Sequence, residues 1–425
     1  MATLLIKHGH VIDPAGQRDG RFDILVEGDT IKNVAATIAA NGAKSIDAEG
    51  LLVLPGFVDL HTHLRQPGRE DKETIETGCR AAVRGGFTTV CAMPNTEPAI
   101  DTGGVAQFVR QEAQRIGLAA VYPVGAITKG RQGQELSDFG ELFEAGCVAL
   151  SDDGHAVANP LLMRRALEYA KVFGRPLIQH AEDSQLVAGG VMHEGLVSTT
   201  LGLRGIPGEA ESVIVARDLA LAELTGGWVH FAHVSSARSV ELIRQAKQRG
   251  VRVTCEVTPH HLALTEQAIG EFDTCAKVNP PLRAEADRQA LIEGLRDGTI
   301  DCIATDHAPH TAWEKDAEFD AAPFGISGLE TALSVCVQTL VEPGLLSWAQ
   351  LVEKLASAPA NIAGLDAGSL RAGGPADLVL VDAKGTWTVE PQRFASKGRN
   401  TPFAGKTLTG SIARVFHAGV QVVGA

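Results

Sequence analysis

The stretch Leu54-Pro55-Gly56-Phe57-Val58-Asp59-Leu60-His61-Thr62-His63 decides the fold. It is an apolar, strand-like run that ends in two histidines, and seven similar runs follow it, beginning near Phe87, Ala119, Cys147, Pro176, Trp228, Val251 and Asp301. Segments with helical spacing lie between the runs, for example 241–247 and 288–295. Strand–helix units repeated over roughly 300 residues predict a (β/α)8 barrel. A doubly wound open sheet is the alternative, but no G-x-G-x-x-G motif follows the first run and no P-loop is present.

The two ends of the chain have a different pattern from the middle. Residues 1–54 contain short strand-like runs at 3–6, 22–26 and 31–34, separated by turns that contain Gly and Asp. Similar runs return at 377–381 and 412–416. We therefore predict an α/β protein with a TIM-like (β/α)8 barrel over residues 55–365. Residues 1–54 and 366–425 would pair into one small β-sandwich domain.

Composition and charge exclude several classes of partner. The formal net charge of the 425-residue chain is −13, with no basic cluster to offset it, which argues against nucleic acid or an anionic membrane as partner. No apolar stretch approaches the roughly 20 residues that a membrane span needs, and the N-terminus lacks signal-peptide features. The seven cysteines are scattered and never form a C-x-x-C pair, so we expect buried free thiols. By elimination, we expect a cytoplasmic protein.

Polar side chains follow most of the predicted barrel strands at the end where barrel enzymes place their chemistry. His61 and His63 are two residues apart on an extended segment, so both can bind one metal ion. His180 and His233 could hold a second ion, with an aspartate bridging the two. Asp152 and Asp153 compete for the bridging position, and their spacing does not decide between them.

The remaining strand ends suggest a base and a carboxylate site. Asp306, after the eighth run, is the candidate general base, because a carboxylate beside a metal-bound water can take its proton and return it to a leaving nitrogen. Arg65, Asn95 and His310 could together receive a substrate carboxylate. The segment from Asp306 to Gly328 has little periodicity, so we expect a structureless lid or substrate loop.

Several other polar residues have simpler interpretations. Alternation assigns His230 to the barrel wall, and His260 and His261 are expected to shape the rim of the pocket or to pack. Glu182 and Asp183 could cap the helix that follows them.

Two longer motifs carry a specific resemblance. The segments Asp59-Leu60-His61-Thr62-His63-Leu64-Arg65-Gln66-Pro67 and Ala304-Thr305-Asp306-His307-Ala308-Pro309-His310, with Lys315 five residues on, resemble the two signature motifs of dihydroorotases in the amidohydrolase superfamily. Met93–Thr96, Asn279–Arg283 and Ser396–Pro402 match as well, and the similarity runs from about residue 3 to the C-terminus.

The resemblance implies an activity and a set of site residues. The reaction would be the reversible closure of N-carbamoyl-L-aspartate to L-dihydroorotate in pyrimidine biosynthesis, with metal-bound hydroxide and with Asp306 as general base and acid. One or two zinc ions per subunit would bind at His61, His63, Asp153, His180, His233 and Asp306. Substrate contacts would come from His63, Arg65, Asn95, Asn279, His310 and the backbone of Phe324 and Gly325. A homodimer is also implied, and association with aspartate transcarbamoylase is possible within the family.

One departure from the wider superfamily narrows the branch. Many members bridge their metals with a carbamylated lysine after the fourth strand, but residues 147–153 contain no lysine. This resembles the bacterial dihydroorotases in which an aspartate takes that place. Two alternatives remain: a cyclic-amide hydrolase of the dihydropyrimidinase, hydantoinase or allantoinase type, and a non-catalytic partner of aspartate transcarbamoylase. The first usually needs the lysine, and the second has typically lost ligands that are all present here.

Overall fold

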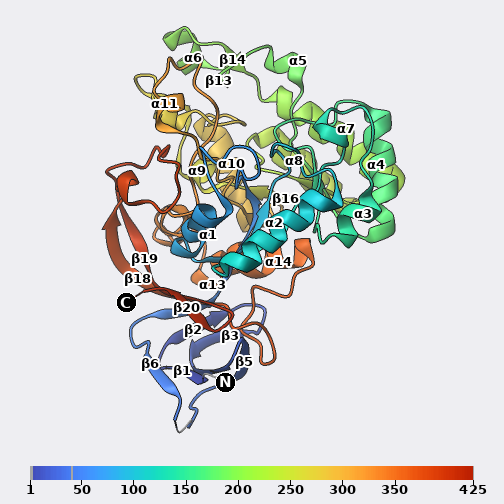
Figure 1. Cartoon of the computed structure of the whole chain (residues 1–425). Coiled ribbons are helices and arrows are strands. Elements are labelled where there is room, and N and C mark those ends of the chain that lie inside the picture. Colours follow the sequence, from blue (N-terminus) through green and yellow to red (C-terminus); the bar gives the residue numbers. More distant parts are fainter. Residues whose placement is uncertain (1–2, 40–41, 425) are drawn as a thin grey trace.

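Parallel strands form a closed barrel at the centre of the molecule (Figure 1). The computed structural model describes residues 3–39 and 42–424. The barrel strands are β8 (Phe57–Thr62), β9 (Phe87–Ala92), β10 (Ala120–Pro123), β11 (Leu150–Ser151), β12 (Leu177–Gln179), β15 (Val229–Phe231), β16 (Val253–Val257) and β17 (Cys302–Ile303). Bridges between Gly125 and Leu150 and between Thr62 and His307 join the three-stranded and five-stranded sheets into a ring. Each strand lies at one of the eight predicted runs, so the predicted barrel is confirmed.

Helices surround the barrel, and most of them follow a strand. They are α1 (Ile75–Arg84), α2 (Gly103–Ile116), α3 (Phe139–Glu144), α4 (Pro160–Phe173), α7 (Glu209–Thr225), α8 (Ala237–Gln248), α10 (Glu285–Arg296), α12 (Ala332–Cys336), α13 (Trp348–Val352) and α14 (Ala358–Ala363). The boundaries of α4 follow from its sequence. The Asn159 side chain accepts hydrogen bonds from the amides of Leu161 and Leu162, Pro160 occupies the first turn, and Gly174 ends the helix with φ 67°.

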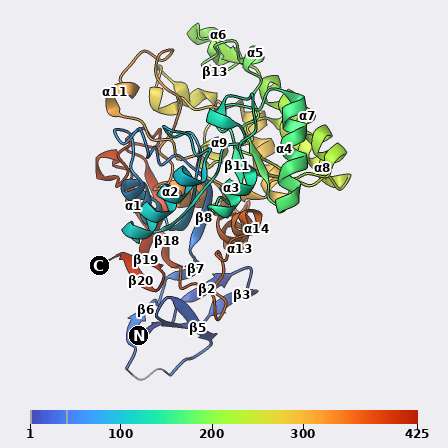
Figure 2. The ribbon, with the colours of Figure 1, turned by 45° about the vertical axis from the view of Figure 1, so that its right-hand side comes forward.

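A small subdomain interrupts the barrel pattern between β12 and α7. It contains α5 (Ser184–Val187), β13 (Met192–His193), α6 (Leu196–Leu201) and β14 (Gly205–Ile206), and it lies at the top of the molecule in Figures 1 and 2. Asp183 caps α5 as expected, because its side chain accepts from the amides of Gln185 and Leu186. The subdomain was not predicted, since its strands have two residues each and show no alternation.

The two ends of the chain form one β domain below the barrel (Figures 1 and 2). One sheet has the order β5-β4-β1-β6 and the other β20-β19-β18-β7-β2-β3. Antiparallel pairing of β7 with β18 joins the N-terminal and C-terminal parts, as predicted. The strands are β1 (Thr3–Lys7), β2 (His10–Asp13), β3 (Arg18–Arg21), β4 (Asp23–Glu27), β5 (Thr30–Ala35), β6 (Lys44–Asp47), β7 (Leu52–Pro55), β18 (Leu378–Thr388), β19 (Thr407–His417) and β20 (Val420–Val423).

Residues from both ends of the chain fill the core between the two sheets. Ile6, Ile24 and Val53 pack there with Leu378 and Phe416, all of them buried. The C-terminal part also reaches the barrel, because Phe394 and Phe403 pack with Val335 of α12. The domain boundaries at residues 54 and 366 stay a prediction.

The segment after β17 differs from the expected structureless lid. It contains the short helix α11 (Ala312–Lys315), and Phe319 and Ile326 are buried in a cluster with residues of the small subdomain and of the segment 276–282. The expected lack of structure was wrong, because the buried anchors are single residues, spaced too irregularly to show a period. The role as a lid or substrate loop stays a prediction.

The cysteines and the lengths of the helices test two further expectations from the sequence. All seven cysteines are free, and only Cys275 is not buried, which confirms the expected thiols. Within residues 3–39 and 42–424, no helix combines the length and apolar character that crossing a membrane requires.

Candidate functional site

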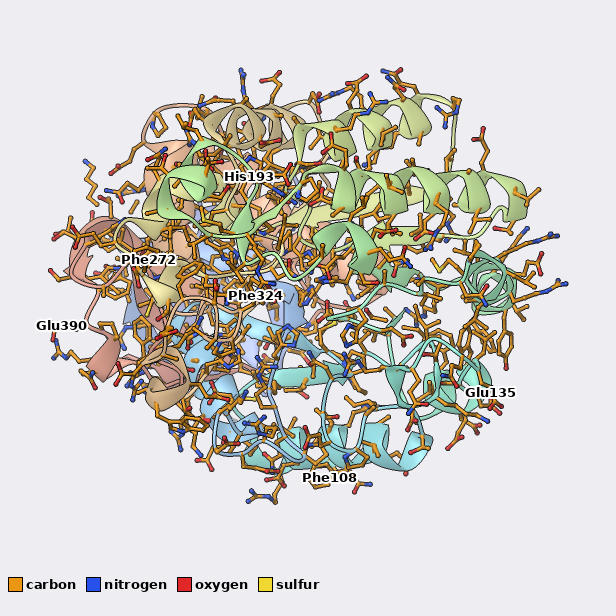
Figure 3. The ribbon with its side chains drawn as sticks, turned by 90° about the horizontal axis from the view of Figure 1, so that it is seen from above. Phe108, Glu135, His193, Phe272, Phe324 and Glu390 are labelled. Atoms are coloured by element: carbon orange, nitrogen blue, oxygen red, sulfur yellow. The ribbon has the colours of Figure 1, made fainter. Side chains whose placement is uncertain are left out.

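The predicted site residues converge at the carboxyl ends of the barrel strands. Arg65, Asn279, His310, Phe324 and Gly325 line a cavity of about 230 Å³ together with His63, Asn95, Asp153, His180, His233 and Asp306. His61 is fully buried beneath them. In the view from above, Phe324 lies near the middle of the molecule, whereas Phe108, Glu135 and Glu390 lie at its edge (Figure 3). A larger groove of about 520 Å³ lies beside the strands β18 and β19, but its lining includes no histidine.

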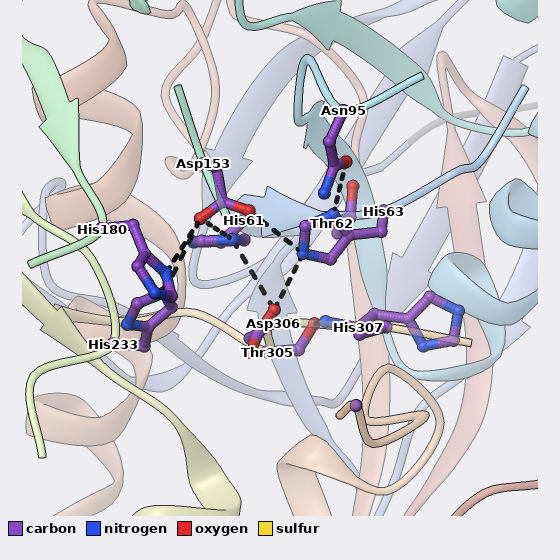
Figure 4. Close-up of polar contacts among 12 residues, drawn as sticks. His61, Thr62, His63, Asn95, Asp153, His180, His233, Thr305, Asp306 and His307 are labelled. Carbon is purple, nitrogen blue, oxygen red and sulfur yellow. Dashed lines mark hydrogen bonds and ion pairs between the residues drawn. The ribbon is translucent and has the colours of Figure 1, made fainter. Parts of the chain in front are cut away.

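Nitrogen and oxygen donors of six residues face one another at the bottom of the cavity (Figure 4). Asp153 Oδ1 lies 3.2 Å from His61 Nε2, 3.6 Å from His180 Nδ1 and 3.7 Å from His233 Nε2. Asp153 Oδ2 lies 3.6 Å from His63 Nε2. Asp306 Oδ1 lies 3.0 Å from His63 Nε2 and 3.6 Å from His61 Nε2.

These distances suit the ligands of a shared metal ion. Ligand atoms at about 2.0–2.2 Å from a tetrahedral ion lie about 3.4 Å from one another. Two groups of three donors lie within 4.8 Å of one another, one of His61, His63 and Asp306 and one of His61, Asp153 and His233. His61 Nε2 and Asp153 Oδ1 are buried atoms with no hydrogen-bond partner in the described chain. Because buried polar atoms are rarely left unpaired, these two atoms fit a cation.

Asp152 and Asp153 contact different residues. The Asp152 carboxylate accepts from Thr128 N at 2.9 Å and from Thr128 Oγ1 at 2.5 Å, so it holds a neighbouring loop. Asp153 points to the histidines, and the guanidinium of Arg131 holds its main-chain carbonyl at 2.6 Å. Of the two aspartates that the sequence left open, Asp153 is therefore the one that lies among the histidines.

Polar partners behind the donors fix their orientation. Asn95 Oδ1 accepts from His63 Nδ1 at 2.8 Å, which leaves His63 Nε2 facing the aspartates. Asp59 accepts from the amides of His61 at 3.1 Å and of Thr305 at 3.0 Å, and so ties the end of β8 to the end of β17. Asn95, predicted to contact substrate, thus also supports a candidate ligand.

The electrostatics of Asp306 favour its ionised form. Burial disfavours the charge, but the hydrogen bond with His63 and the nearby His61 outweigh burial and hold the pKa of Asp306 below its ordinary value. The backbone at Asp306 has φ 45°, and Arg65 and His233 also have positive φ, at 61° and 33°. Non-glycine residues in this region carry strain of about 1–3 kcal/mol each and concentrate at functional sites.

Arg65 and His310 lie together at one side of the cavity, with a lysine that the sequence analysis missed. Lys72 Nζ lies 2.8 Å from Glu314 Oε1 and 3.3 Å from His310 Nδ1. Burial and then the charges of Arg65 and Lys72 lower the pKa of His310 to about 3, so this imidazole is neutral near pH 7. A carbonyl oxygen only accepts, so His310 Nε2 carries the proton that it donates to Phe324 O at 2.9 Å. The neutral ring then accepts on Nδ1, from Lys72 and not from Glu314, whose Oε2 lies at the same 3.3 Å.

Asn279 faces the cavity from the opposite side. Its Nδ2 donates to Glu182 Oε2 at 2.6 Å, and its Oδ1 is buried without a partner in the described chain. This arrangement presents an acceptor to a ligand N–H group. Glu182 therefore orients Asn279 and does not cap α5.

Two buried lysines fix the backbone of Phe324 and Gly325. Lys277 Nζ donates to Phe319 O at 2.6 Å, and Lys315 Nζ donates to Pro323 O at 2.7 Å. The amide of Gly325 donates to Lys277 O at 2.9 Å. The Gly325 amide is thus paired, and the carbonyls of Phe324 and Gly325 also accept hydrogen bonds, from His310 and Asn400. The substrate contact expected from this backbone therefore stays a prediction.

Asn400, near the end of the chain, connects two loops at the cavity. Its Nδ2 donates to Ala308 O at 3.0 Å and to Gly325 O at 2.9 Å. Its Oδ1 accepts from His310 N at 3.0 Å and from Ser327 Oγ at 2.9 Å. The sequence match around Arg399 and Asn400 thus corresponds to a supporting residue, not to one that lines the cavity.

Comparisons with known proteins agree with this geometry. A family model described as "Dihydro-orotase-like" matches residues 50–239. The dihydroorotase of Anaeromyxobacter dehalogenans (strain 2CP-C) is 56% identical over 411 residues, which cover 96% of this chain and 95% of that protein. The chain belongs to the dihydroorotase family. A second member, from Pelotomaculum thermopropionicum, is 54% identical over 407 residues, covering 96% of this chain and 95% of that protein.

Solved structures extend the likeness to the fold of related hydrolases. The L-hydantoinase (dihydropyrimidinase) from Arthrobacter aurescens superposes with a TM-score of 0.90 at 26% identity. The superposition covers 100% of the present chain and 96% of the hydantoinase. The dihydropyrimidinase from Brevibacillus agri NCHU1002 superposes with a TM-score of 0.84 at 22% identity, covering 99% and 95%. At 22% identity the second comparison supports the fold alone.

Proposed function

We propose that the chain is a dihydroorotase that interconverts N-carbamoyl-L-aspartate and L-dihydroorotate in pyrimidine biosynthesis. The observation that carries the proposal is the cavity itself, whose lining holds both a cluster of candidate metal ligands, with Asp306 among them, and the guanidinium of Arg65. A cyclic amide that bears a carboxylate needs both, because the metal ligands serve the amide and the guanidinium serves the carboxylate. The 56% identity to a dihydroorotase over nearly the whole chain supports the same substrate.

We propose that one or two zinc ions per subunit bind at His61, His63, Asp153, His180, His233 and Asp306. When bound, a divalent cation polarises the ring carbonyl and lowers the pKa of a coordinated water toward about 7. Imidazole nitrogens with carboxylate oxygens are a donor set that zinc favours. Asp153 would offer both carboxylate oxygens to the metal, since its Oδ1 faces His61, His180 and His233 and its Oδ2 faces His63.

Asp306 would move the proton in the reaction. In the hydrolytic direction, water adds to the carbonyl carbon of the ring amide and the carbon–nitrogen bond breaks. Asp306 takes a proton from the attacking water and returns it to the leaving nitrogen, so that ring closure follows the same steps in reverse. The position of Asp306 supports this role, because its carboxylate lines the cavity with Oδ1 3.0 Å from His63 Nε2.

The remaining cavity residues would bind and orient the substrate. Arg65 would hold the substrate carboxylate with its two terminal nitrogens, because its Nε is directed at Pro309 O at 3.4 Å. Asn95 Nδ2 would complete that site, and His310 would join it by turning its Nε2–H from Phe324 O to the carboxylate. Asn279 Oδ1 would accept a ring N–H, as its unpaired position suggests.

We also propose a compartment and an assembly for the protein. Free cysteines throughout the chain are usual in the reducing cytoplasm, where we place the protein. A homodimer and an association with aspartate transcarbamoylase stay predictions from the family resemblance.

A substrate panel tests the proposed function. Purified protein with quantified metal would be assayed with dihydroorotate, dihydrouracil, hydantoin and allantoin, and with N-carbamoyl-L-aspartate in the direction of closure. We expect dihydroorotate to have the highest kcat/KM by at least two orders of magnitude. A higher kcat/KM for hydantoin or dihydrouracil would refute the proposal, and so would an inactive metal-loaded protein.

A further inference from the structure

A chain of buried polar side chains runs through the barrel interior away from His61. Glu256, on β16, has Oε1 at 3.0 Å from His61 Nδ1 and Oε2 at 3.1 Å from the Nε2 of His230, on β15. The side chains of these three residues have no exposed surface. They reach the interior because their neighbours Val229, Phe231, Val253, Cys255 and Val257 pack toward the helices on the opposite face of the same strands.

The chain continues to the other end of the barrel. His230 Nδ1 lies 2.9 Å from Thr254 Oγ1, and Trp228 Nε1 donates to the same hydroxyl at 3.0 Å. Arg252 stacks on the Trp228 ring at 4.4 Å from its centroid. Five polar side chains, His61, Glu256, His230, Thr254 and Trp228, are therefore connected in sequence.

The donors and acceptors allow one direction along this chain. An indole N–H only donates, so Thr254 accepts from Trp228. An ionised Glu256 only accepts, so a neutral His230 carries its proton on Nε2 and receives the Thr254 hydroxyl proton on Nδ1. An ionised carboxylate only accepts, so His61 must donate from Nδ1, which leaves its Nε2 with a free lone pair. That Nε2 is the buried, unpaired atom that faces Asp153.

The competing interpretation of these buried side chains is a second metal site around His230 and Glu256, in the middle of the hydrogen-bonded series. Nitrogen, oxygen and sulfur donors of His230, Glu256 and Cys302 lie within 4.8 Å of one another. However, both Glu256 oxygens and both His230 nitrogens already have hydrogen-bond partners. Burial also raises the pKa of Cys302 well above its ordinary value, so its sulfur stays protonated and is a poor ligand.

We propose that Glu256 is a positioning residue for the metal centre, which fixes the proton of His61 on Nδ1 and so presents Nε2 to a divalent cation. His230, Thr254 and Trp228 hold the Glu256 carboxylate in that orientation. The inference rests on the proposed metal site and deepens it. Carboxylate partners behind ligating histidines typically change metal affinity 10- to 100-fold. Glu256 also adds a negative charge next to the cation beyond those of Asp153 and Asp306.

The first test compares metal affinity in two glutamate variants of the full chain. Glu256→Gln keeps the shape of the side chain, accepts from His61 through its oxygen and can donate to His230 through its amide, but it lacks the charge. Glu330→Gln is the matched control, because Glu330 is largely buried, accepts from the amides of Ala395 and Ser396, and lies outside the cavity. Zn²⁺ affinity would be measured by competition with a chromophoric chelator.

We expect Glu256→Gln to bind Zn²⁺ about 10- to 100-fold more weakly than wild type. The Zn²⁺ affinity of the control Glu330→Gln should stay within about threefold of wild type. Glu330 lies outside the cavity, so loss of its hydrogen bonds should not change metal binding. Equal affinity of Glu256→Gln and wild type, or an equal loss in both variants, would overturn the proposal. The measurement needs no substrate, so its failure is distinct from the failure of the proposed reaction.

The second test needs no variant and so does not depend on folding of Glu256→Gln. In Cd²⁺-loaded wild type with ¹⁵N-labelled histidine, we expect one-bond cadmium coupling to Nε2 of His61, and the His230 proton on Nε2. Coupling to Nδ1 of His61, or a His230 proton on Nδ1 alone, would overturn the proposal. Where Glu256→Gln folds, its amide should donate to His230 Nε2 and move the His230 proton to Nδ1, and an unchanged His230 tautomer counts against the proposal.

Discussion

Replacing Arg65 by Met tests whether the guanidinium reads the substrate carboxylate. Methionine keeps an unbranched stem of similar length and, like arginine, has a Cβ, so the strain of the φ 61° backbone is unchanged. Arg65 costs free energy to bury, because desolvation lowers its pKa to about 10, and an arriving carboxylate offsets that cost. Two charge-assisted hydrogen bonds, reduced by the water that reaches the cavity, give a loss of about 2–4 kcal/mol. This corresponds to binding about 30- to 1000-fold weaker.

The assay separates the carboxylate from the ring. Binding of orotate, which has the carboxylate, would be compared with binding of uracil, which lacks it, by calorimetry on metal-loaded protein. In Arg65→Met we expect orotate to weaken by the full factor and uracil by less than about threefold.

Arg69→Met is the control for this prediction. Arg69 is a nearby, partly exposed arginine that contacts Asp71 and Glu314, so its loss should leave the binding of both ligands unchanged. If Arg65→Met weakened orotate and uracil equally, or left orotate unchanged, the assignment of the carboxylate site to Arg65 would be wrong.

Three further predictions concern other parts of the site. Asp306→Asn should lower kcat by about 10²–10⁴ while the metal content measured by elemental analysis stays near that of wild type, because five other donors remain. Lys72→Met should raise the pKa of His310 from about 3 toward its ordinary 6.5, measured by ¹⁵N NMR titration, because a positive charge 3.3 Å from Nδ1 is removed. Asn400→Ala should lower the free energy of unfolding in urea by about 2–4 kcal/mol and raise KM, because four hydrogen bonds to the two cavity loops are lost.

The lowered pKa of His310 also predicts how stability depends on pH, and each of the three predictions has an outcome that would contradict it. A depressed histidine pKa stabilises the fold fully above pH 6.5, and this stability is lost as the pH falls toward 3, so Lys72→Met should flatten the acid limb of the stability profile. An unchanged His310 titration in Lys72→Met would remove Lys72 from the site. Near-normal turnover in Asp306→Asn would exclude it as the base. Wild-type stability of Asn400→Ala would mean that the two loops hold without it.

The sequence predicted the donors of the site because each of them follows a strand. His61, His180, His233 and Asp306 stand at the ends of apolar runs, where the geometry of a barrel brings them together. The choice between Asp152 and Asp153 was beyond the sequence, since adjacent residues in a turn can both point inward. It depends on Thr128, which belongs to another strand–loop unit and captures Asp152.

The supporting residues were harder to predict because they act across long sequence separations. Glu256 is 195 positions from His61, and the one available signal was a charged residue at an inward position of an otherwise apolar strand. Lys72 lies 238 positions from His310, in a loop with no pattern of its own. The fold followed from repetition, which a single sequence displays, whereas these pairs depend on exact contacts in space.

The pairing of β7 with β18 has a consequence for the order in which the protein can be made. The N-terminal sheet cannot bury Ile6, Ile24 and Val53 until Leu378 and Phe416 have left the ribosome. The first fifty or so residues must therefore wait, with their apolar faces uncovered, through the synthesis of the entire barrel. A nascent chain halted before residue 400 would lack both Phe416, which helps to cover that sheet, and the Asn400 side chain. Completion of the cavity thus follows synthesis of the entire barrel, and chaperone binding should concentrate on the uncovered N-terminal sheet during that interval.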